Sequence, residues 1–258
     1  MESLEYRECL IELIYQLADD DFLLAYRGSE WLGLAPHIEE DVAFASISQD
    51  LMGHAALYYG LLEDLGEGKV DKLTHDRSPE QFRNAILVEL PNGTGTYLED
   101  PSYDWAFTVV RNYFYTLSKK IRLDSIKKAS YEPLQQIVQK ISIEMSYHMM
   151  HWEVWFNQLI NSTPEARRRM EEAVKTVIEE LGGVFSYGRF GDRMVRLSLI
   201  ESEEVLKQRW ITYLNKEVAK EPLTMKQGNG RNGVHTIHLA NALDTLSEVY
   251  KSVPTAEW

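Results

Sequence analysis

The stretch from Leu134 to Ile160 constrains the fold more than any other part of the chain. Glu144, His148 and His151 lie inside it, and helical geometry places Glu144 and His148 about 40° apart, with His151 about 60° from His148 on the other side. Such polar side chains in apolar surroundings need a metal ion, another side chain or water as a partner. The apolar residues recur every three or four positions, as on one face of a helix: Leu134, Ile137, Ile141, Met145, Met149, Trp152, Trp155, Phe156 and Leu159.

Composition limits the class of protein. The 258 residues suffice for one large domain or two small ones. We find no apolar run of about 18 residues and no apolar signal core behind the charged N-terminus. The single cysteine, Cys9, suits a reducing cytoplasm. A net charge of −13 argues against nucleic acid or an anionic membrane as a partner. We therefore expect a cytoplasmic protein with neither kind of partner.

Helical periodicity extends over most of the chain, and no strand pattern competes with it. Four long helices joined by mostly short links predict an all-α antiparallel four-helix bundle with additional C-terminal helices. We expect one domain over 1–258, with a core bundle at about 4–160 and further helices at about 163–253. The expected helices are 4–27, 36–65, 78–89, 104–128, 134–160, 163–187, 202–220 and 236–253; the expected loops are 28–36, 90–95 and 226–233, and 189–198 is left without an assignment.

Ligand-type side chains occur about 13 to 17 positions into the first, second and fourth long helices. In an antiparallel bundle these positions meet at one level, as in di-iron carboxylate proteins with their Glu and Glu-x-x-His ligands. Of the acidic triplet at 19–21, only the middle residue continues the apolar face, and the bland interpretation places all three in solvent. The candidates are Asp20, Asp50, His54, Glu144 and His148.

The sequence departs from the di-iron pattern at three places. Gly53 and Tyr147 stand where the histidines belong, and the third long helix has no acid between Asp104 and Asp124. A four-residue spacing can still chelate one metal. Alternatively, a cation of the third helix, Arg111 or Lys120, neutralises the carboxylates in a metal-free polar network. Both possibilities remain open on the residues alone.

Six motifs carry a family resemblance in the right order along nearly the whole chain. They are LADDDFLLAYRGSEW at 17–31, EED at 39–41, IxxDLMGHA at 47–55, LVELPNG at 87–93, ExSYHxxH at 144–151 and GRNGVHT at 230–236. In these six motifs the chain resembles the structural ferritin-like subunits of the ring-1,2-phenylacetyl-CoA epoxidase, which is also called phenylacetate-CoA oxygenase.

The resemblance implies a non-catalytic role in aerobic phenylacetate degradation. A different ferritin-like subunit would hold the di-iron site, and this chain would pair with it and stabilise it, without a cofactor of its own. A small accessory subunit and a reductase would complete the system, and the isolated chain is expected to form homo-oligomers. The remnant of the lost metal centre would be a network of Asp20, Asp50, His54, Arg111, Glu144 and His148.

Two of the motif regions suggest contacts with other molecules. Glu30, Trp31 and Asn92 lie on expected loops, where they serve either partner contact or turn chemistry. Arg231 in the glycine loop at 230–236 could contact a partner or a phosphate of coenzyme A, or it could form a structural C-terminal clasp.

Two other functions compete with the scaffold interpretation. The chain could itself be a di-iron carboxylate oxygenase with an unusual ligand set, which stoichiometric iron would favour. It could also be a free-standing helical binding protein, which co-purification with another ferritin-like chain would exclude.

Overall fold

The computed structural model describes residues 3–214, 225–226 and 230–253. It is 74% helical with only 4% strand, so the expected all-α class is confirmed, and this content is compatible with a ferritin-like helical bundle. The chain divides into two compact units, one of Met1–Pro91 with Gly230–Trp258 and one of Asn92–Asn229. Within the described segments, no helix is long and apolar enough to cross a membrane. The single-domain organisation expected for 1–258 stays a prediction.

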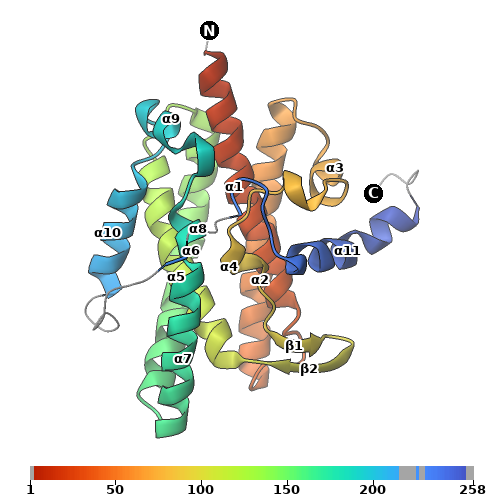
Figure 1. Ribbon diagram of the computed structural model, residues 1–258, viewed down its shortest axis with the longest axis vertical. Coiled ribbons are helices and arrows are strands. Elements are labelled where there is room, and N and C mark those ends of the chain that lie inside the picture. Colours follow the sequence, from red (N-terminus) through yellow and green to blue (C-terminus); the bar gives the residue numbers. More distant parts are fainter. Residues whose placement is uncertain (1–2, 215–224, 227–229, 254–258) are drawn as a thin grey trace. The chain divides into compact units, whose positions relative to one another are not determined.

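The first unit is built around the helical hairpin of α1 (Leu4–Ser29) and α2 (Ile38–Asp64), which lie side by side (Figure 1). The Ser3 hydroxyl caps α1 by accepting a hydrogen bond from the Tyr6 amide at 3.2 Å. Acidic residues at 39–41 suit the positive end of the α2 dipole. The remaining elements are α3 (Val70–His75), the 3-10 turn η1 (Pro79–Gln81), α4 (Ile86–Glu89) and α11 (Ile237–Ser252).

The second unit packs α5 (Trp105–Ile126) against α6 (Glu132–Ile160) and α7 (Pro164–Glu180). Helix α10 (Glu203–Leu214) joins this core through Trp210, whose indole donates a hydrogen bond to the Phe114 carbonyl at 3.1 Å. The two rings also meet edge to face, with centroids 5.2 Å apart. The smaller elements are β1 (Gly93–Thr96), β2 (Glu99–Tyr103), α8 (Gly182–Phe185), η2 (Gly188–Phe190) and α9 (Gly191–Arg196).

The long helices begin and end within two residues of the sequence prediction, but two local assignments were wrong. The segment expected as one helix over 78–89 is broken into η1 and α4, because the amides of Arg83 and Ala85 donate to carboxylates of α1 instead of to helical carbonyls. The segment expected as a loop at 90–95 contributes to an antiparallel hairpin of β1 and β2. A GTGT strand has no apolar alternation, so periodicity could not reveal it.

The C-terminal assignments were right in part. The unassigned segment 189–198 contains η2 and α9, and the helix expected at 163–187 ends at Glu180 and is followed by the short α8. Helix α10 is described as far as Leu214, and 215–220 of the expected helix lie outside the described residues, as do 227–229 of the expected loop.

Candidate functional site

Three consecutive carboxylates of α1, Asp19, Asp20 and Asp21, are completely buried. Successive residues of a helix point about 100° apart, so the three side chains face three different neighbours. The burial of Asp20 agrees with its place on the apolar face. The expectation that Asp19 and Asp21 point toward solvent was wrong, because the segment after α3 and helix α2 cover those two directions.

The first carboxylate, Asp19, is held by a guanidinium, a phenol and an amide. The Tyr59 hydroxyl donates to it at 2.6 Å, the Arg83 amide at 2.7 Å, and Arg77 Nη1 at 3.1 Å. Arg77 also stacks on the Phe82 ring, 3.9 Å from its centroid. Burial, and then the charge of Asp19, raise the pKa of the Tyr59 hydroxyl well above its usual value, so the phenol stays a donor.

The second carboxylate, Asp20, forms a two-pronged ion pair with Arg231. Nη1 and Nη2 of the guanidinium donate to Oδ1 and Oδ2, each at 2.8 Å, and the Ala85 amide adds a third bond at 2.7 Å. Both side chains are at most 1% exposed. Arg231 Nη1 also donates to the Arg83 carbonyl at 2.7 Å. The planar guanidinium matches both oxygens of the carboxylate and neutralises it.

The backbone of the loop that carries Arg231 packs closely against the segment before α4. A Cβ on Gly230, whose φ is +73°, would come within 2.2 Å of the Asn84 carbonyl oxygen, so only glycine fits there. Near the end of the same loop, His235 Nδ1 lies 2.7 Å from Glu89 Oε2, and the Thr236 amide donates to Glu89 Oε1 at 2.7 Å. These contacts favour the structural C-terminal clasp as the role of GRNGVHT, the alternative to a phosphate site.

The third carboxylate, Asp21, faces α2. His54 Nδ1 lies 3.9 Å from its Oδ2, and both side chains are buried. Asp21 therefore takes the place beside His54 that the spacing argument had suggested for Asp20. Asp50, one turn earlier on α2, is only half-buried.

The candidates of the second unit lie on α5 and α6. Arg111 is completely buried, donates to Asn92 Oδ1, and stacks over the Phe107 ring at 5.1 Å. On α6, His148 is buried and Glu144 is half-buried. Asp20, Asp50 and His54 belong to the other unit, and the single network expected from all six residues stays a prediction. The cation found on Asp20 is Arg231.

The residues proposed for partner contact differ in their exposure. Asn92 and Arg231 are each 1% exposed and are hydrogen-bonded within their own units. Trp31 is 5% exposed, and Glu30 is half-buried and paired with Arg27 at 2.9 Å. Partner contact stays a prediction for all four residues, and of these Glu30 has the most accessible side chain.

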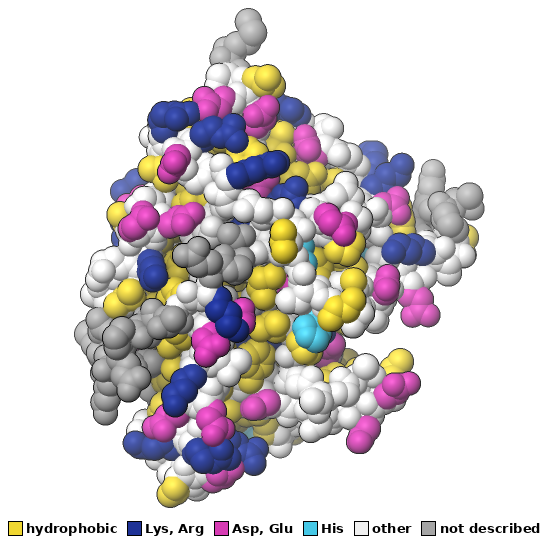
Figure 2. Space-filling view, in the orientation of Figure 1, with side chains coloured by type: hydrophobic (Ala, Val, Ile, Leu, Met, Phe, Trp, Pro, Cys, Tyr) yellow, Lys and Arg dark blue, Asp and Glu magenta, His cyan; other side chains and the backbone are white. Residues whose placement is uncertain are grey.

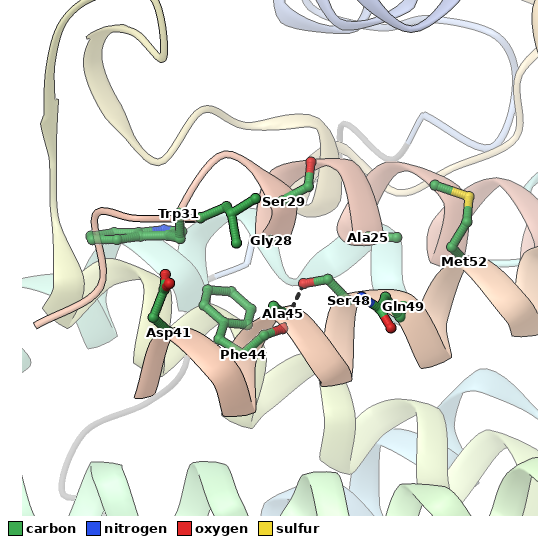
Figure 3. A pocket seen from close by; sticks show the side chains of 11 residues that line it. Ala25, Gly28, Ser29, Trp31, Asp41, Phe44, Ala45, Ser48, Gln49 and Met52 are labelled. Carbon is green, nitrogen blue, oxygen red and sulfur yellow. Dashed lines mark hydrogen bonds between the residues drawn. The ribbon is translucent and has the colours of Figure 1, made fainter. Parts of the chain in front are cut away.

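A pocket of about 270 Å³ opens between the end of α1 and the first half of α2 (Figure 3). Its wall is almost entirely apolar and includes Trp31, Phe44 and Met52. The two helices approach closely at its edge, where a Cβ on Gly28 would lie 2.1 Å from Ser48 Oγ. The Ser48 hydroxyl itself donates to the Phe44 carbonyl at 2.8 Å.

The buried polar contacts of the first unit also include Arg77, Glu89 and His235, and sequence reasoning missed all three. Glu89 and His235 both lie in family motifs, at 87–93 and 230–236, but nothing local links two motifs so far apart. A useful signal was available in the triplet itself, because buried carboxylates require buried cations. In the part of the chain that the structure describes, no group of three or more His, Cys, Asp or Glu side chains is placed to hold a metal ion.

The chain is similar to known proteins over its full length. A curated relative from Escherichia coli (strain K12), named as the C subunit of 1,2-phenylacetyl-CoA epoxidase, is 26% identical over 249 residues, which cover 94% of this chain and 96% of the relative. The family model described as phenylacetic acid catabolic protein matches residues 1–258. The resemblance found in the six motifs is thereby confirmed: the chain belongs to the phenylacetic acid catabolic protein family.

Proposed function

We propose that this chain is the non-catalytic structural subunit of a multicomponent phenylacetyl-CoA epoxidase. In this role it pairs with a separate di-iron catalytic subunit and stabilises it. Membership of the family and the name of the Escherichia coli relative, one subunit of such an epoxidase, support the assignment to a complex of this kind. The division of labour between the two subunits is the part that we propose.

The observation that carries the proposal is the ion pair of Asp20 and Arg231. In a di-iron bundle, an inward carboxylate of the first helix binds metal. In this chain a guanidinium engages both oxygens of that carboxylate and balances its charge. Asp19, its neighbour, is engaged by Arg77 in the same way. Arginine side chains thus supply the positive charge that metal ions would supply to such carboxylates in a catalytic subunit.

Features of the sequence support the same conclusion. Gly53 and Tyr147 stand at the two positions where a Glu-x-x-His spacing requires histidine. Helix α5 contributes Arg111 and no acid before Asp124. A di-iron centre needs about four carboxylates, and this helix cannot supply its share.

The expected setting follows from the family. We expect the complex to be cytoplasmic and to include a small accessory subunit and a reductase, with the di-iron cofactor confined to the catalytic subunit. Nucleic acid is not an expected partner of a chain with a net charge of −13. Without its partner, the chain is expected to form homo-oligomers.

The test is metal analysis of the isolated chain and of the complex. The chain is purified after growth with added iron, alone and together with the catalytic subunit from the same gene set. We expect iron only in the complex, and epoxidation of phenylacetyl-CoA only when both subunits and the reductase are present. One or two irons per isolated chain, lost in an Asp20→Asn variant, would instead identify the chain as a di-iron oxygenase with an unusual ligand set.

A further inference from the structure

Helix α2 carries an apolar stripe over residues 38–56 that is largely exposed. Ile38, Val42 and Met52 are 75%, 67% and 37% exposed. The stripe follows alternating steps of four and three residues, the spacing of a helix that packs lengthwise against another helix. We define the α2 stripe as Ile38, Val42, Ala45, Gln49, Met52 and Ala56; all are apolar except Gln49.

The opposite face of the same helix is apolar as well, since it packs into the first unit through Phe44, Leu51 and Tyr58. An apolar face of a helix is normally covered by another part of a protein. In addition, large exposed apolar patches on soluble proteins mark interaction sites. Helix α2 therefore has the composition of a helix that lies between two partners.

Two glycines beside the stripe point to a close neighbour. A Cβ added at Gly53 or Gly60 meets nothing within 4 Å, and neither residue has a positive φ. Glycine inside a helix is less favourable than alanine, and at these positions the described part of the chain shows no packing reason for it. Gly28 on α1 is different, because a Cβ there meets Ser48. Gly53 and Gly60 would allow the backbone of a second helix to approach α2 closely.

The apolar pocket lies next to this stripe and extends it. Ala45, Gln49 and Met52 belong to both, and Trp31 forms part of the pocket wall (Figure 3). A pocket of about 270 Å³ accommodates one large apolar side chain. Interfaces of tight complexes characteristically anchor such a side chain in a pocket of this kind.

The charged side chains of α2 indicate which kind of partner surface fits the stripe. Figure 2 shows a face on which acidic and basic side chains are interspersed. Helix α2 contains no Lys or Arg, and its acids that are not buried are Glu39, Asp41, Asp50, Glu63 and Asp64, of which Glu63 is paired with Lys69 at 2.6 Å. In a symmetric pair of this chain about α2, acids would face acids. The complementary surface is an apolar helix flanked by Lys and Arg.

We infer that the α2 stripe and its pocket are the docking surface for such a helix, carried by the catalytic subunit. The inference rests on the proposed function and specifies the surface that serves it. One apolar side chain of the partner helix occupies the pocket, and basic side chains on both flanks face the acids of α2.

The experiment measures the affinity between this chain and the catalytic subunit. Val42→Arg places a cation in the stripe, and Gly53→Leu adds bulk where close approach is expected. The matched control is Val249→Arg on α11, because Val249 is 65% exposed and lies in the same unit. We expect the Kd to rise by about 30-fold for Val42→Arg, as for an interface hot spot, and about 10-fold for Gly53→Leu. The control should stay within about twofold.

Each other outcome has a definite meaning. If the unaltered chain does not bind the catalytic subunit, the proposed function fails. If it binds and the stripe variants bind equally well, the inference alone is overturned. The inference is also overturned if Val42→Arg lowers the Tm of the isolated chain at a concentration where it is monomeric, which shows that the chain itself covers the stripe. Binding that is insensitive to salt would rule out a basic partner helix, and a homodimer disrupted by Val42→Arg would make a second copy the occupant.

Discussion

Asp20 and Arg231 are 211 positions apart in the chain and form a buried ion pair with two parallel hydrogen bonds of 2.8 Å. The pair fixes the C-terminal segment of the first unit to the middle of α1, and its guanidinium also holds the Arg83 carbonyl. One contact thus neutralises a buried carboxylate of α1 and also holds the loop that leads into α11.

Removal of one partner of this pair should be strongly destabilising. Asp20→Ala or Arg231→Met leaves the other charge buried without its main partner, which costs about 3–5 kcal/mol. The double variant Asp20→Ala with Arg231→Met should lose less than the sum of the two single variants, because neither charge remains. Urea unfolding followed by circular dichroism measures these differences.

The matched control for that pair is Arg168→Ala on α7, whose guanidinium bonds to Glu165 and Glu172 on the surface. Its unfolding midpoint should barely change, because exposed ion pairs contribute little. Equal midpoints for Arg231→Met and Arg168→Ala would contradict the structural role assigned to Arg231.

The hydrogen bond between Arg111 and Asn92 links α5 to the start of the hairpin of β1 and β2. Asn92→Ala removes an acceptor from a buried guanidinium and should destabilise the protein by about 1–3 kcal/mol. Gln136→Ala is the control, because Gln136 makes an exposed bond to Glu132. Thermal melting compares the two, and the same midpoint for both variants would show that the bond is dispensable.

Two helical glycines should respond to alanine in opposite ways. Gly28→Ala forces a Cβ against Ser48 Oγ, 2.1 Å away, and should cost about 1–3 kcal/mol through overpacking. Gly53→Ala meets open space and should stabilise the isolated chain by about 0.5–1 kcal/mol. Guanidinium unfolding gives both values. A loss of stability at Gly53 would reveal a neighbour that covers this face within the chain.

Stability should fall with acidification through His75. Burial lowers the pKa of its imidazole below the usual 6.5, and the ring stacks on Tyr250 with centroids 5.2 Å apart. Because the unfolded chain binds the proton more readily, this contribution is complete above about pH 6.5 and is lost as the pH falls toward the lower folded pKa. His75→Phe should flatten the pH dependence of the Tm in that range. Parallel curves for the two proteins would contradict this.

The sequence by itself determined the four long helices and the family. Apolar residues at helical spacing located α1, α2, α5 and α6 within two residues, because periodicity is a local property that helix geometry imposes. The six motifs identified the family that the full-length comparisons then showed. Asp20 was correctly placed on the buried face of α1 by the same periodicity.

Only the tertiary structure decided how the buried charges are paired. The sequence contains 27 Lys and Arg residues, and spacing within a helix does not indicate which of them reaches a given carboxylate. The segments that carry Arg231 and Arg77 fold over α1 and bring these cations to Asp20 and Asp19. Asp19 is buried by the segment after α3 and Asp21 by α2, which periodicity had not indicated. Ion pairs between distant segments depend on where the chain folds back, and this is set by packing of the whole unit.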